Sequence, residues 1–239
     1  MSKQKEIIGN GVIHFGDAIE IMRGLESASV DMVFTDPPYR TISGGKNSTL
    51  GAGWKTSVLS ENDGKIFAYN DVDRFAYLSE MFRVMKDGSH AYVMTNNLNL
   101  KDSLIDADRV GFGFHNLLVW RKNTCTANRW YMKEMELVLF LYKRPARKIN
   151  DPGSKQIFES ANIRDKIHPT QKPVDLISHY IKNSSNPGDV VLDPFAGSGS
   201  TAVAAELTGR KWITSEIDPE FYEVAINNIR SNCVGWDLV

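Results

Sequence analysis

The chain has 239 residues, of which 42% are hydrophobic and 24% are charged, and its formal net charge is -1. A chain of this length and composition is typical of one globular α/β domain, which we expect to span residues 1–239. The balanced charge excludes a globally basic protein, so a nucleic-acid surface would have to come from locally clustered charge.

The two cysteines, Cys125 and Cys233, lie far apart and lack CxxC spacing. This pattern predicts reduced thiols, no zinc site and a cytoplasmic protein. No stretch approaches the roughly 20 apolar residues of a membrane-spanning helix, so we expect no contact with a membrane.

The first part of the chain predicts a βαβ unit. Strands are expected at 12–15 and 30–35, and the apolar residues of 19–25 share one side of a short helix between them. The second strand is almost entirely apolar, which is typical of a sheet covered on both faces.

Asp36-Pro37-Pro38-Tyr39 follows this second strand. Prolines donate no backbone hydrogen bond and restrict the residue before them, so the side chains of this tetrad are held in an extended geometry. Two interpretations fit these residues alone, namely an ordinary strand-ending turn and a catalytic motif at the rim of an active site.

Residues 40–66 contain five glycines and four serines and show no periodicity. Loops of this length inside a compact domain are usually functional lids or disordered insertions. Trp54, Lys46 and Lys55 favour a mobile loop over a substrate.

The middle of the chain predicts alternating helices and strands. Phe75, Leu78, Phe82 and Met85 repeat at helical spacing and indicate a helix that stops at Gly88. The next elements are expected to be a strand at 91–94, a helix from Leu100 to near Gly111, antiparallel strands at 116–120 and 136–142, and an irregular stretch at 149–165.

The C-terminal part continues this alternation. Pro173 is expected to be the first residue of a helix, and Asp218-Pro219 to begin the last one. Strands are expected at 190–192 and 211–215, with a helix through Ala202 and Leu207 between them.

Basic side chains cluster between residues 121 and 148, where eight basic residues stand against two acidic ones. Asparagines and aromatic residues are interleaved with them, which suits phosphate contacts together with hydrogen bonds to base edges or stacking. A solvated basic surface is the alternative. The residues predicted to contact nucleic acid are Arg121, Lys122, Asn123, Asn128, Arg129, Trp130, Lys133 and Arg144, within an embedded region at 121–165.

A second candidate site lies at Phe195 to Gly199, between a strand and a helix. Glycines let a ligand approach the backbone, and a helix N-terminus offers free N–H groups. Glu216 ends the following strand, where a carboxylate can accept both hydroxyls of a ribose. The full GxGxxG pyrophosphate fingerprint is absent, so S-adenosylmethionine, a nucleoside cofactor without a diphosphate, fits better than NAD.

Three motifs together resemble a known family. The DPPY tetrad at 36–39, the HPTQKP stretch at 168–173 and the FxGxG motif at 195–199 are similar to those of β-class DNA amino-methyltransferases, in the same permuted order. The resemblance covers nearly the whole chain. It implies a Rossmann-like, doubly wound and mostly parallel sheet of seven strands, in which the strands ending at Asp36 and Asp193 are neighbours at the topological switch.

The resemblance also implies S-adenosylmethionine as cofactor and double-stranded DNA as substrate. In the implied chemistry, the Asp36 carboxylate and the Pro37 carbonyl accept the N–H groups of a flipped base, and Tyr39 stacks on its ring. No metal and no covalent intermediate are expected. The implied catalytic residues are Asp36, Pro37, Pro38 and Tyr39, and the implied cofactor-binding residues are Asp17, Ala18, His168, Thr170, Lys172, Asp193, Phe195, Ala196, Gly197, Ser198, Gly199, Thr201, Glu216 and Ile217.

Several alternatives stay open at this stage. Asp36 favours adenine N6 as the target, but cytosine N4 presents the same amino group. RNA remains an alternative substrate, because the basic cluster does not report the sugar. A protein glutamine methyltransferase fits less well, since such enzymes typically begin the tetrad with Asn and place the cofactor motif first. A catalytically silent DNA-binding regulator fits less well because tetrad and cofactor loop are intact.

The recognition region at 121–165 is short for a monomer that must read a site and grip both strands, so we expect a homodimer. We also expect a bacterial or phage-encoded protein. Neither the recognition sequence nor a restriction partner is legible in the residues.

Overall fold

The computed structural model describes residues 4–38, 72–126, 131–163, 166–168 and 171–233. Its strands are β1 (Lys5–Ile8), β2 (Gly11–Phe15), β3 (Val30–Thr35), β4 (Met85–Thr95), β5 (Gly113–Thr126), β6 (Lys133–Tyr142), β7 (Ile157–Ser160), β8 (Val190–Asp193) and β9 (Lys211–Glu216). Its helices are α1 (Ala18–Arg23), α3 (Arg74–Val84), α4 (Leu100–Val110), α5 (Val174–Ser184), α6 (Ser200–Leu207) and α7 (Pro219–Cys233).

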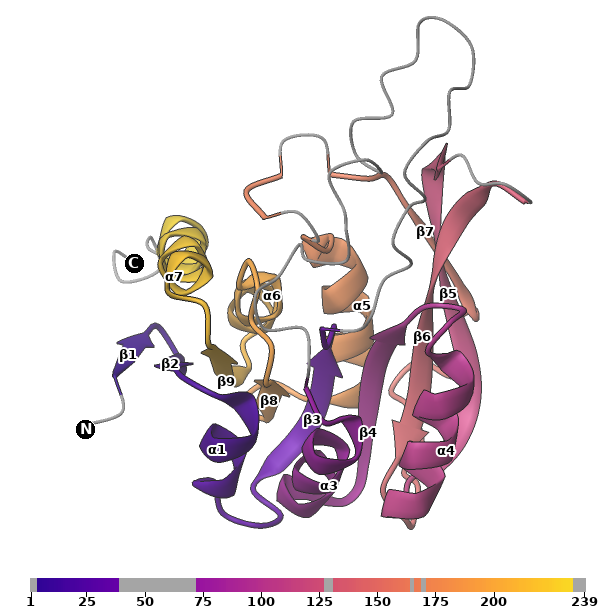
Figure 1. Ribbon diagram of the computed structural model, residues 1–239, viewed down its shortest axis with the longest axis horizontal. Helices are drawn as coiled ribbons and strands as arrows, with labels where there is room; N and C mark the ends of the chain where they lie inside the picture. Colours follow the sequence, from indigo (N-terminus) through magenta and orange to yellow (C-terminus); the bar gives the residue numbers. More distant parts are fainter. Residues whose placement is uncertain (1–3, 39–71, 127–130, 164–165, 169–170, 234–239) are drawn as a thin grey trace, which may run out of the picture.

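The strands form one sheet with helices on both faces (Figure 1). In the described part of the chain the sheet has nine strands, in the order β1-β2-β9-β8-β3-β4-β6-β5-β7. Five neighbouring pairs are parallel and three are antiparallel. The predicted α/β fold and mostly parallel sheet are therefore confirmed, whereas the predicted number of seven strands is wrong.

The two unpredicted strands lie at the edges of the sheet. β1 pairs antiparallel with β2, and β7 pairs parallel with β5 inside the stretch predicted to be irregular. Each has four residues. A segment this short carries no readable period, and it becomes a strand because a neighbouring strand offers free backbone groups.

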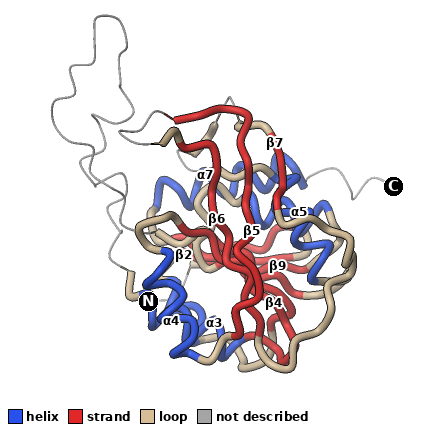
Figure 2. The backbone as a smooth tube through the Cα atoms, turned by 90° about the vertical axis from the view of Figure 1, so that its right-hand side faces the viewer, coloured by secondary structure: helices blue, strands red, loops and turns tan. Residues whose placement is uncertain are grey.

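β3 occupies the centre of the sheet and pairs in parallel with β4 and β8. All six of its residues are buried, as its apolar sequence predicts. Helices α1, α3 and α4 cover one face and α5, α6 and α7 cover the other, so an apolar core lies on each side of the strand. Figure 2 shows α3 and α4 on one side of the sheet and α5 on the other. Phe34 points into one core and Val33 into the other.

Two predicted helix ends differ from the structure. α3 ends at Val84 rather than Gly88, because Met85 is buried and already pairs with Val30 as the first residue of β4. Pro173 is the N-cap of α5 and not its first helical residue. The predicted end of α4 is confirmed, since Gly111 adopts a left-handed φ of 110° that favours glycine.

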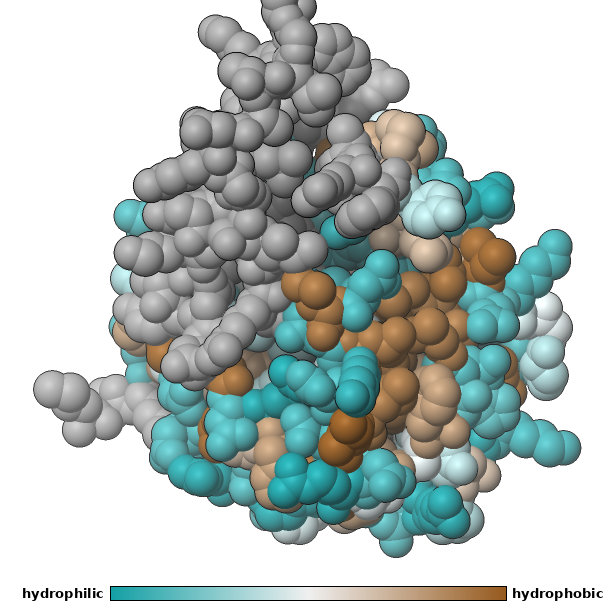
Figure 3. All heavy atoms as spheres, turned by 45° about the vertical axis from the view of Figure 1, so that its right-hand side comes forward, coloured by the Kyte–Doolittle hydropathy of each residue, from teal (hydrophilic) through white to brown (hydrophobic). Residues whose placement is uncertain are grey.

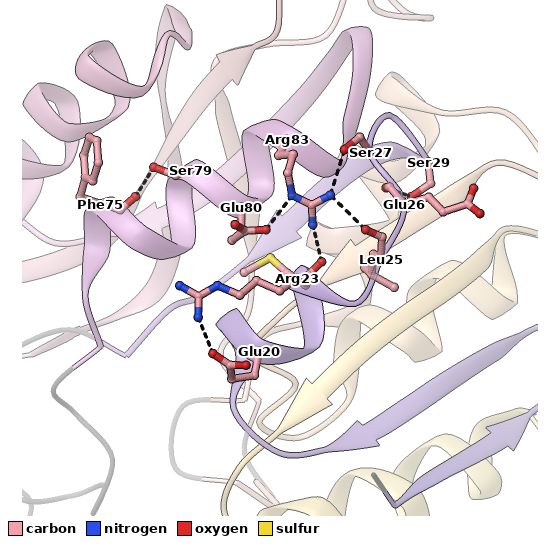
Figure 4. Close-up of polar contacts among 11 residues, drawn as sticks. Glu20, Arg23, Leu25, Glu26, Ser27, Ser29, Phe75, Ser79, Glu80 and Arg83 are labelled. Atoms are coloured by element: carbon pink, nitrogen blue, oxygen red, sulfur yellow. Dashed lines mark hydrogen bonds and ion pairs between the residues drawn. The ribbon is translucent and has the colours of Figure 1, made fainter. Parts of the chain in front are cut away.

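Arg83 fixes the turn between α1 and β3 against α3 (Figure 4). Its guanidinium donates to the carbonyl oxygens of Leu25 at 3.0 Å and Met22 at 2.6 Å, and to the Glu80 carboxylate at 2.8 Å. These bonds satisfy carbonyls at the C-terminal end of α1. The turn that leads into β3, the strand before the tetrad, is therefore held against α3.

No helix in the described ranges has both the length and the apolar run needed to cross a membrane. Cys125 and Cys233 are free thiols, and Cys125 is exposed.

A buried polar chain links β4 to α5. The His90 ring contacts the Ser184 hydroxyl through Nδ1 at 2.8 Å and the Arg147 carbonyl through Nε2 at 3.0 Å. A carbonyl only accepts, so Nε2 carries the proton and Nδ1 accepts from Ser184. Burial lowers the pKa of His90 from 6.5 to about 4, which keeps the ring neutral in the fold.

This pKa predicts a loss of stability at acidic pH. The contribution of neutral His90 is fully present above pH 6.5 and is lost as the pH falls towards 4. From pH 7 to pH 5 the free energy of unfolding should fall by about 2 kcal/mol through this group. Urea unfolding at both pH values should show that His90→Gln removes this share. His115→Gln, at an exposed histidine, should keep it, and an unchanged pH dependence in His90→Gln would contradict the assignment.

Candidate active site

The tetrad and the glycine loop lie at the ends of neighbouring strands. β3 pairs in parallel with β8 through Met32 and Val191, and β8 pairs in parallel with β9. The predicted adjacency of the strands that end at Asp36 and Asp193 is therefore confirmed. Parallel strands present their carboxyl ends at one edge of a sheet, which is where open α/β sheets hold ligands.

Asp193 joins the two motifs through its side chain. The Thr35 hydroxyl donates to Oδ1 at 2.8 Å, and the Thr201 hydroxyl donates to Oδ2 at 2.5 Å. The backbone N–H of Phe195 also donates to Oδ1, at 3.1 Å. The carboxyl group is buried, and burial raises its pKa to about 7. Asp193 thus connects β3, the glycine loop and α6, while its predicted contact with a cofactor stays a prediction.

The glycine loop is bound to the end of β9. Gly197 and Gly199 have φ values of +50° and +76°, which favour glycine. The N–H of Gly197 donates to Glu216 Oε2 at 2.9 Å, and the N–H groups of Ile217 and Asp218 donate to Oε1 at 3.0 Å. Burial raises the pKa of Glu216 despite these donors. The structure thus brings Glu216 and the loop into contact, as the cofactor prediction requires.

The remaining members of the loop are largely enclosed. Ala196 and Ser198 are 6% and 4% exposed. The Ala196 N–H donates to the Ser215 carbonyl at 2.8 Å. Phe195 packs edge-on against Tyr77 of α3, with ring centroids 5.3 Å apart, within the roughly 4.5–7 Å that such pairs favour.

Asp17 and Ala18 begin α1 at the same edge of the sheet. Asp17 Oδ1 accepts from the N–H of Glu20 at 3.0 Å and so caps the helix. The preceding Gly16 donates its N–H to the Glu216 carbonyl at 2.9 Å. Asp17, a predicted cofactor-binding residue, therefore lies beside the end of β9, which carries Glu216.

His168 lies against the glycine loop. Its ring contacts Phe221 with centroids 4.2 Å apart, and a Cβ added to Gly197 would lie 3.3 Å from its Cε1. Burial lowers the pKa of His168 to about 4, so the ring is neutral. His168 therefore packs on the glycine loop, and its predicted contact with a cofactor stays a prediction. Thr170, from the same motif, lies outside the described residues.

Lys172 connects the HPTQKP stretch to the tetrad. Its ammonium forms an ion pair with Asp36 Oδ2 and lies 3.5 Å from Glu136 Oε2 on β6. The side chain is only 8% exposed. The sequence analysis assigned Lys172 to the cofactor and missed its contact with Asp36, the carboxylate predicted to be catalytic. It also missed Glu136, because only the fold brings β6 next to the tetrad.

Pro37 and Pro38 line a cavity of about 430 Å³, together with Tyr77 of α3 and Thr95 at the end of β4. Neither Tyr77 nor Thr95 was singled out from the sequence, although the position of Thr95 at a strand end was a usable signal. Tyr39 and the predicted loop at 40–66 lie outside the described residues.

The predicted DNA-contacting residues fall into separate places. Arg121, Lys122 and Asn123 lie near the carboxyl end of β5, and Lys133 begins β6 at the same edge. Arg144 follows the other end of β6, because that strand runs antiparallel to β4 and β5. The structure therefore does not bring Arg144 together with the others. Asn128, Arg129 and Trp130 lie outside the described residues.

Acidic partners hold two of these basic side chains. Arg121 pairs with Glu159 of β7 at 2.5 Å, and Lys122 forms an ion pair with Glu136. Asn123 accepts the N–H of Asn162 at 3.0 Å through its side-chain oxygen. In the described ranges, no group of three or more His, Cys, Asp or Glu side chains is arranged to hold a metal ion.

A protein-family model described as DNA methylase, of the N6/N4 methyltransferase type, matches residues 30–227. Two curated relatives resemble the chain over most of both lengths. The DNA adenine methyltransferase YhdJ of Escherichia coli K12 is 29% identical over 257 residues, which cover 91% of this chain and 82% of YhdJ. The type II methyltransferase M2.DpnII of Streptococcus pneumoniae is 25% identical over 236 residues, which cover 90% of this chain and 87% of that protein.

Solved structures share the fold. The complex of M1.HpyAVI with S-adenosylmethionine has a TM-score of 0.68 at 22% identity, covering 90% of this chain and 97% of that one. The cytosine-N4-specific PvuII DNA methyltransferase has a TM-score of 0.70 at 19% identity, covering 95% and 89%.

The Asp193 contacts predict a large cost of truncation. Asp193→Ala should lower the free energy of unfolding by on the order of 3 kcal/mol, because it leaves the buried hydroxyls of Thr35 and Thr201 without their acceptor. Asp193→Asn keeps one acceptor and should cost less. Urea unfolding measures both, and the exposed Asp87→Ala serves as control, expected within about 0.5 kcal/mol of wild type. Equal stabilities of Asp193→Ala and Asp87→Ala would refute this assignment.

Proposed function

Because this chain belongs to the N6/N4 DNA methylase family, we propose that it transfers the methyl group of S-adenosylmethionine to N6 of a flipped-out adenine in DNA. One observation supports this proposal above the others. The Thr35–Asp193 hydrogen bond, 2.8 Å long, sets the DPPY tetrad and the glycine loop side by side at the ends of β3 and β8. A methyl donor at the loop and an acceptor at the tetrad would then share one edge of the sheet.

The residues at this edge fit the cofactor. The carboxylate of Glu216 is an acceptor suited to ribose hydroxyls, and Gly197 and Gly199 allow the positive φ values of the loop beside it. His168 lies against this loop, and Asp17 follows Gly16, whose N–H donates to the Glu216 carbonyl. When bound, S-adenosylmethionine supplies an electrophilic methyl group on its sulfonium.

The tetrad supplies acceptors for the target amino group. An exocyclic amino nitrogen is a poor nucleophile, because its lone pair is delocalised into the ring. If Asp36 and the Pro37 carbonyl each accept one N–H, the nitrogen is drawn towards tetrahedral geometry and its lone pair can be aimed at the methyl group. Tyr39 would offer its ring for stacking. The cavity of about 430 Å³ beside Pro37 and Pro38 is in the size range of small-molecule sites.

The choice of adenine rests on Asp36 and on the relatives. YhdJ, 29% identical, is a DNA adenine methyltransferase, and Asp at the first tetrad position favours adenine. Cytosine N4 is the second candidate, because the PvuII enzyme is cytosine-N4-specific and shares the fold with a TM-score of 0.70. Both bases present the same amino group to the tetrad.

The DNA surface is proposed at the β5–β6 end of the site. Arg121, Lys122, Asn123 and Lys133 gather there, on the same edge of the sheet as Asp36. Salt-sensitive contacts with phosphates would position the duplex, and base-edge contacts would specify the site. Arg144 lies at the opposite end of the strands and is the residue of the predicted DNA-contacting set with the least support.

A homodimer is proposed from the short recognition region and from an exposed apolar surface. Ile157 is 50% exposed and Met135 is 51% exposed. Ile157 pairs with Val119 and Met135 pairs with Arg121, two residues further along β5, so both lie on one face of the sheet. Figure 3 shows apolar side chains gathered on this side of the molecule. A second copy of the chain would cover them.

The catalytic proposal is tested by substitution at the tetrad. Asp36→Ala or Tyr39→Ala should slow DNA methylation by about 100-fold or more, because each removes a group that acts on the amino group or the ring. Calorimetry should show that both variants bind S-adenosylmethionine as wild type does. Mass spectrometry of nucleosides from methylated DNA should show N6-methyladenine. Wild-type turnover by Asp36→Ala would contradict the mechanism. Detection of N4-methylcytosine in place of N6-methyladenine would show that cytosine is the target base.

The dimer is tested by light scattering. Wild type should show twice the mass of the chain at the concentrations used for activity, and Ile157→Glu should reduce this mass by placing a charge in the apolar surface. The matched control is Ile7→Glu, at an exposed apolar residue on the opposite edge strand β1. A monomeric wild type with full activity would count against the dimer.

A further inference from the structure

A row of alternating charges runs from the tetrad to the proposed DNA surface. The Asp36 carboxylate pairs with the Lys172 ammonium, which lies 3.5 Å from Glu136 Oε2. Oε1 of Glu136 pairs in turn with Lys122 on β5. Glu136 is therefore the shared anion between a lysine that touches the catalytic carboxylate and a lysine of the recognition region.

We propose that Glu136 is a positioning residue for methyl transfer, which holds Lys172 so that Asp36 can accept the target amino group. The inference rests on the proposed function, since it concerns the same site. Glu136 touches neither base nor cofactor in this proposal and acts through Lys172.

The Lys172 ammonium is buried, so the presence of Glu136 as a second carboxylate affects how it pairs with Asp36. The side chain of Lys172 is 8% exposed, and that of Asp36 is 18% exposed. A buried ammonium must keep an anionic partner, because water does not replace it. An arriving amino group competes with Lys172 for the Asp36 carboxylate. With Glu136 at 3.5 Å, Lys172 can move towards a second carboxylate and stay paired.

Charge balance around Glu136 supports the same role. Burial alone raises the pKa of Glu136, but the ammonium groups of Lys172 and Lys122 outweigh it and lower the pKa. Lys166 interacts electrostatically with the same groups. Burial lowers the pKa of Lys166 most, Lys122 and Lys172 lower it further, and Glu136 raises it. Three lysines thus face one glutamate. Removal of that charge would strengthen the pairing of Lys172 with Asp36.

The surrounding strands fix Glu136 at this place. β6 pairs antiparallel with β5, and Glu136 lies opposite Trp120. The Lys122 ammonium lies 4.9 Å from the centre of the Trp120 ring, so the ring and the carboxylate hold it together. Since Lys122 belongs to the proposed DNA surface, Glu136 also connects contact with DNA to the state of Asp36.

The test compares Glu136→Gln with Glu136→Asp, which keeps the charge. Glu134→Gln is the matched control, because Glu134 lies two residues away on β6 and is exposed. Single-turnover methylation is measured at saturating DNA and S-adenosylmethionine, cofactor affinity by calorimetry, and stability by urea unfolding. Glu136→Gln should slow single turnover by about 10- to 100-fold, with cofactor affinity unchanged. Glu136→Asp should recover part of the rate, and Glu134→Gln should match wild type.

Each other result overturns the proposal. A wild-type single-turnover rate in Glu136→Gln removes any positioning role. Equal slowing in Glu134→Gln would indicate a general effect of charge on this strand. A slow Glu136→Gln variant that has lost cofactor binding and stability, with no recovery in Glu136→Asp, would indicate a structural role only. Failure of the proposed function is distinguishable, because wild type itself would then methylate no DNA.

Discussion

The buried carboxylate of Asp193 is the contact on which the candidate site depends. Its oxygens accept the hydroxyls of Thr35, which is 158 residues earlier in the chain, and of Thr201 in α6. Thr35 directly precedes Asp36, and Thr201 follows the glycine loop. Because a buried carboxylate is costly unless its oxygens are hydrogen-bonded, the two hydroxyls and the carboxylate require one another. The tetrad and the loop are thereby held in one fixed relation.

Lys172 adds the third motif to this arrangement. Its ammonium touches Asp36 from the segment that leads into α5, and its second contact, with Glu136, reaches β6. The antiparallel pairing of β5 with β6 then brings Lys122 to the same carboxylate. Lys122, which could contact DNA, and Asp36, which could act on a base, are therefore linked through the charges of Glu136 and Lys172. The proposed positioning role of Glu136 rests on this link.

Some predictions differ from the structure for identifiable physical reasons. Arg144 was grouped with Arg121 because the two are close in a basic stretch, but β6 runs away from the site and leaves Arg144 at the opposite end of the strands, and its contact with DNA stays a prediction. Met85 was assigned to a helix by its spacing, yet parallel pairing with Val30 makes it the start of β4. The edge strands β1 and β7 are too short for a pattern and form only where a neighbour offers free backbone groups.

The sequence by itself determined the α/β class, the central strand and the location of both motifs. Apolar runs such as 30–35, the prolines after Asp36 and the glycines at 197 and 199 act through local backbone preference and burial, which are legible in the residues. The tertiary structure alone decided which charges meet. The ion pairs of Lys172 and the hydrogen bonds of Asp193 join residues far apart in the chain, and such contacts depend on strand order and register, which local pattern does not encode.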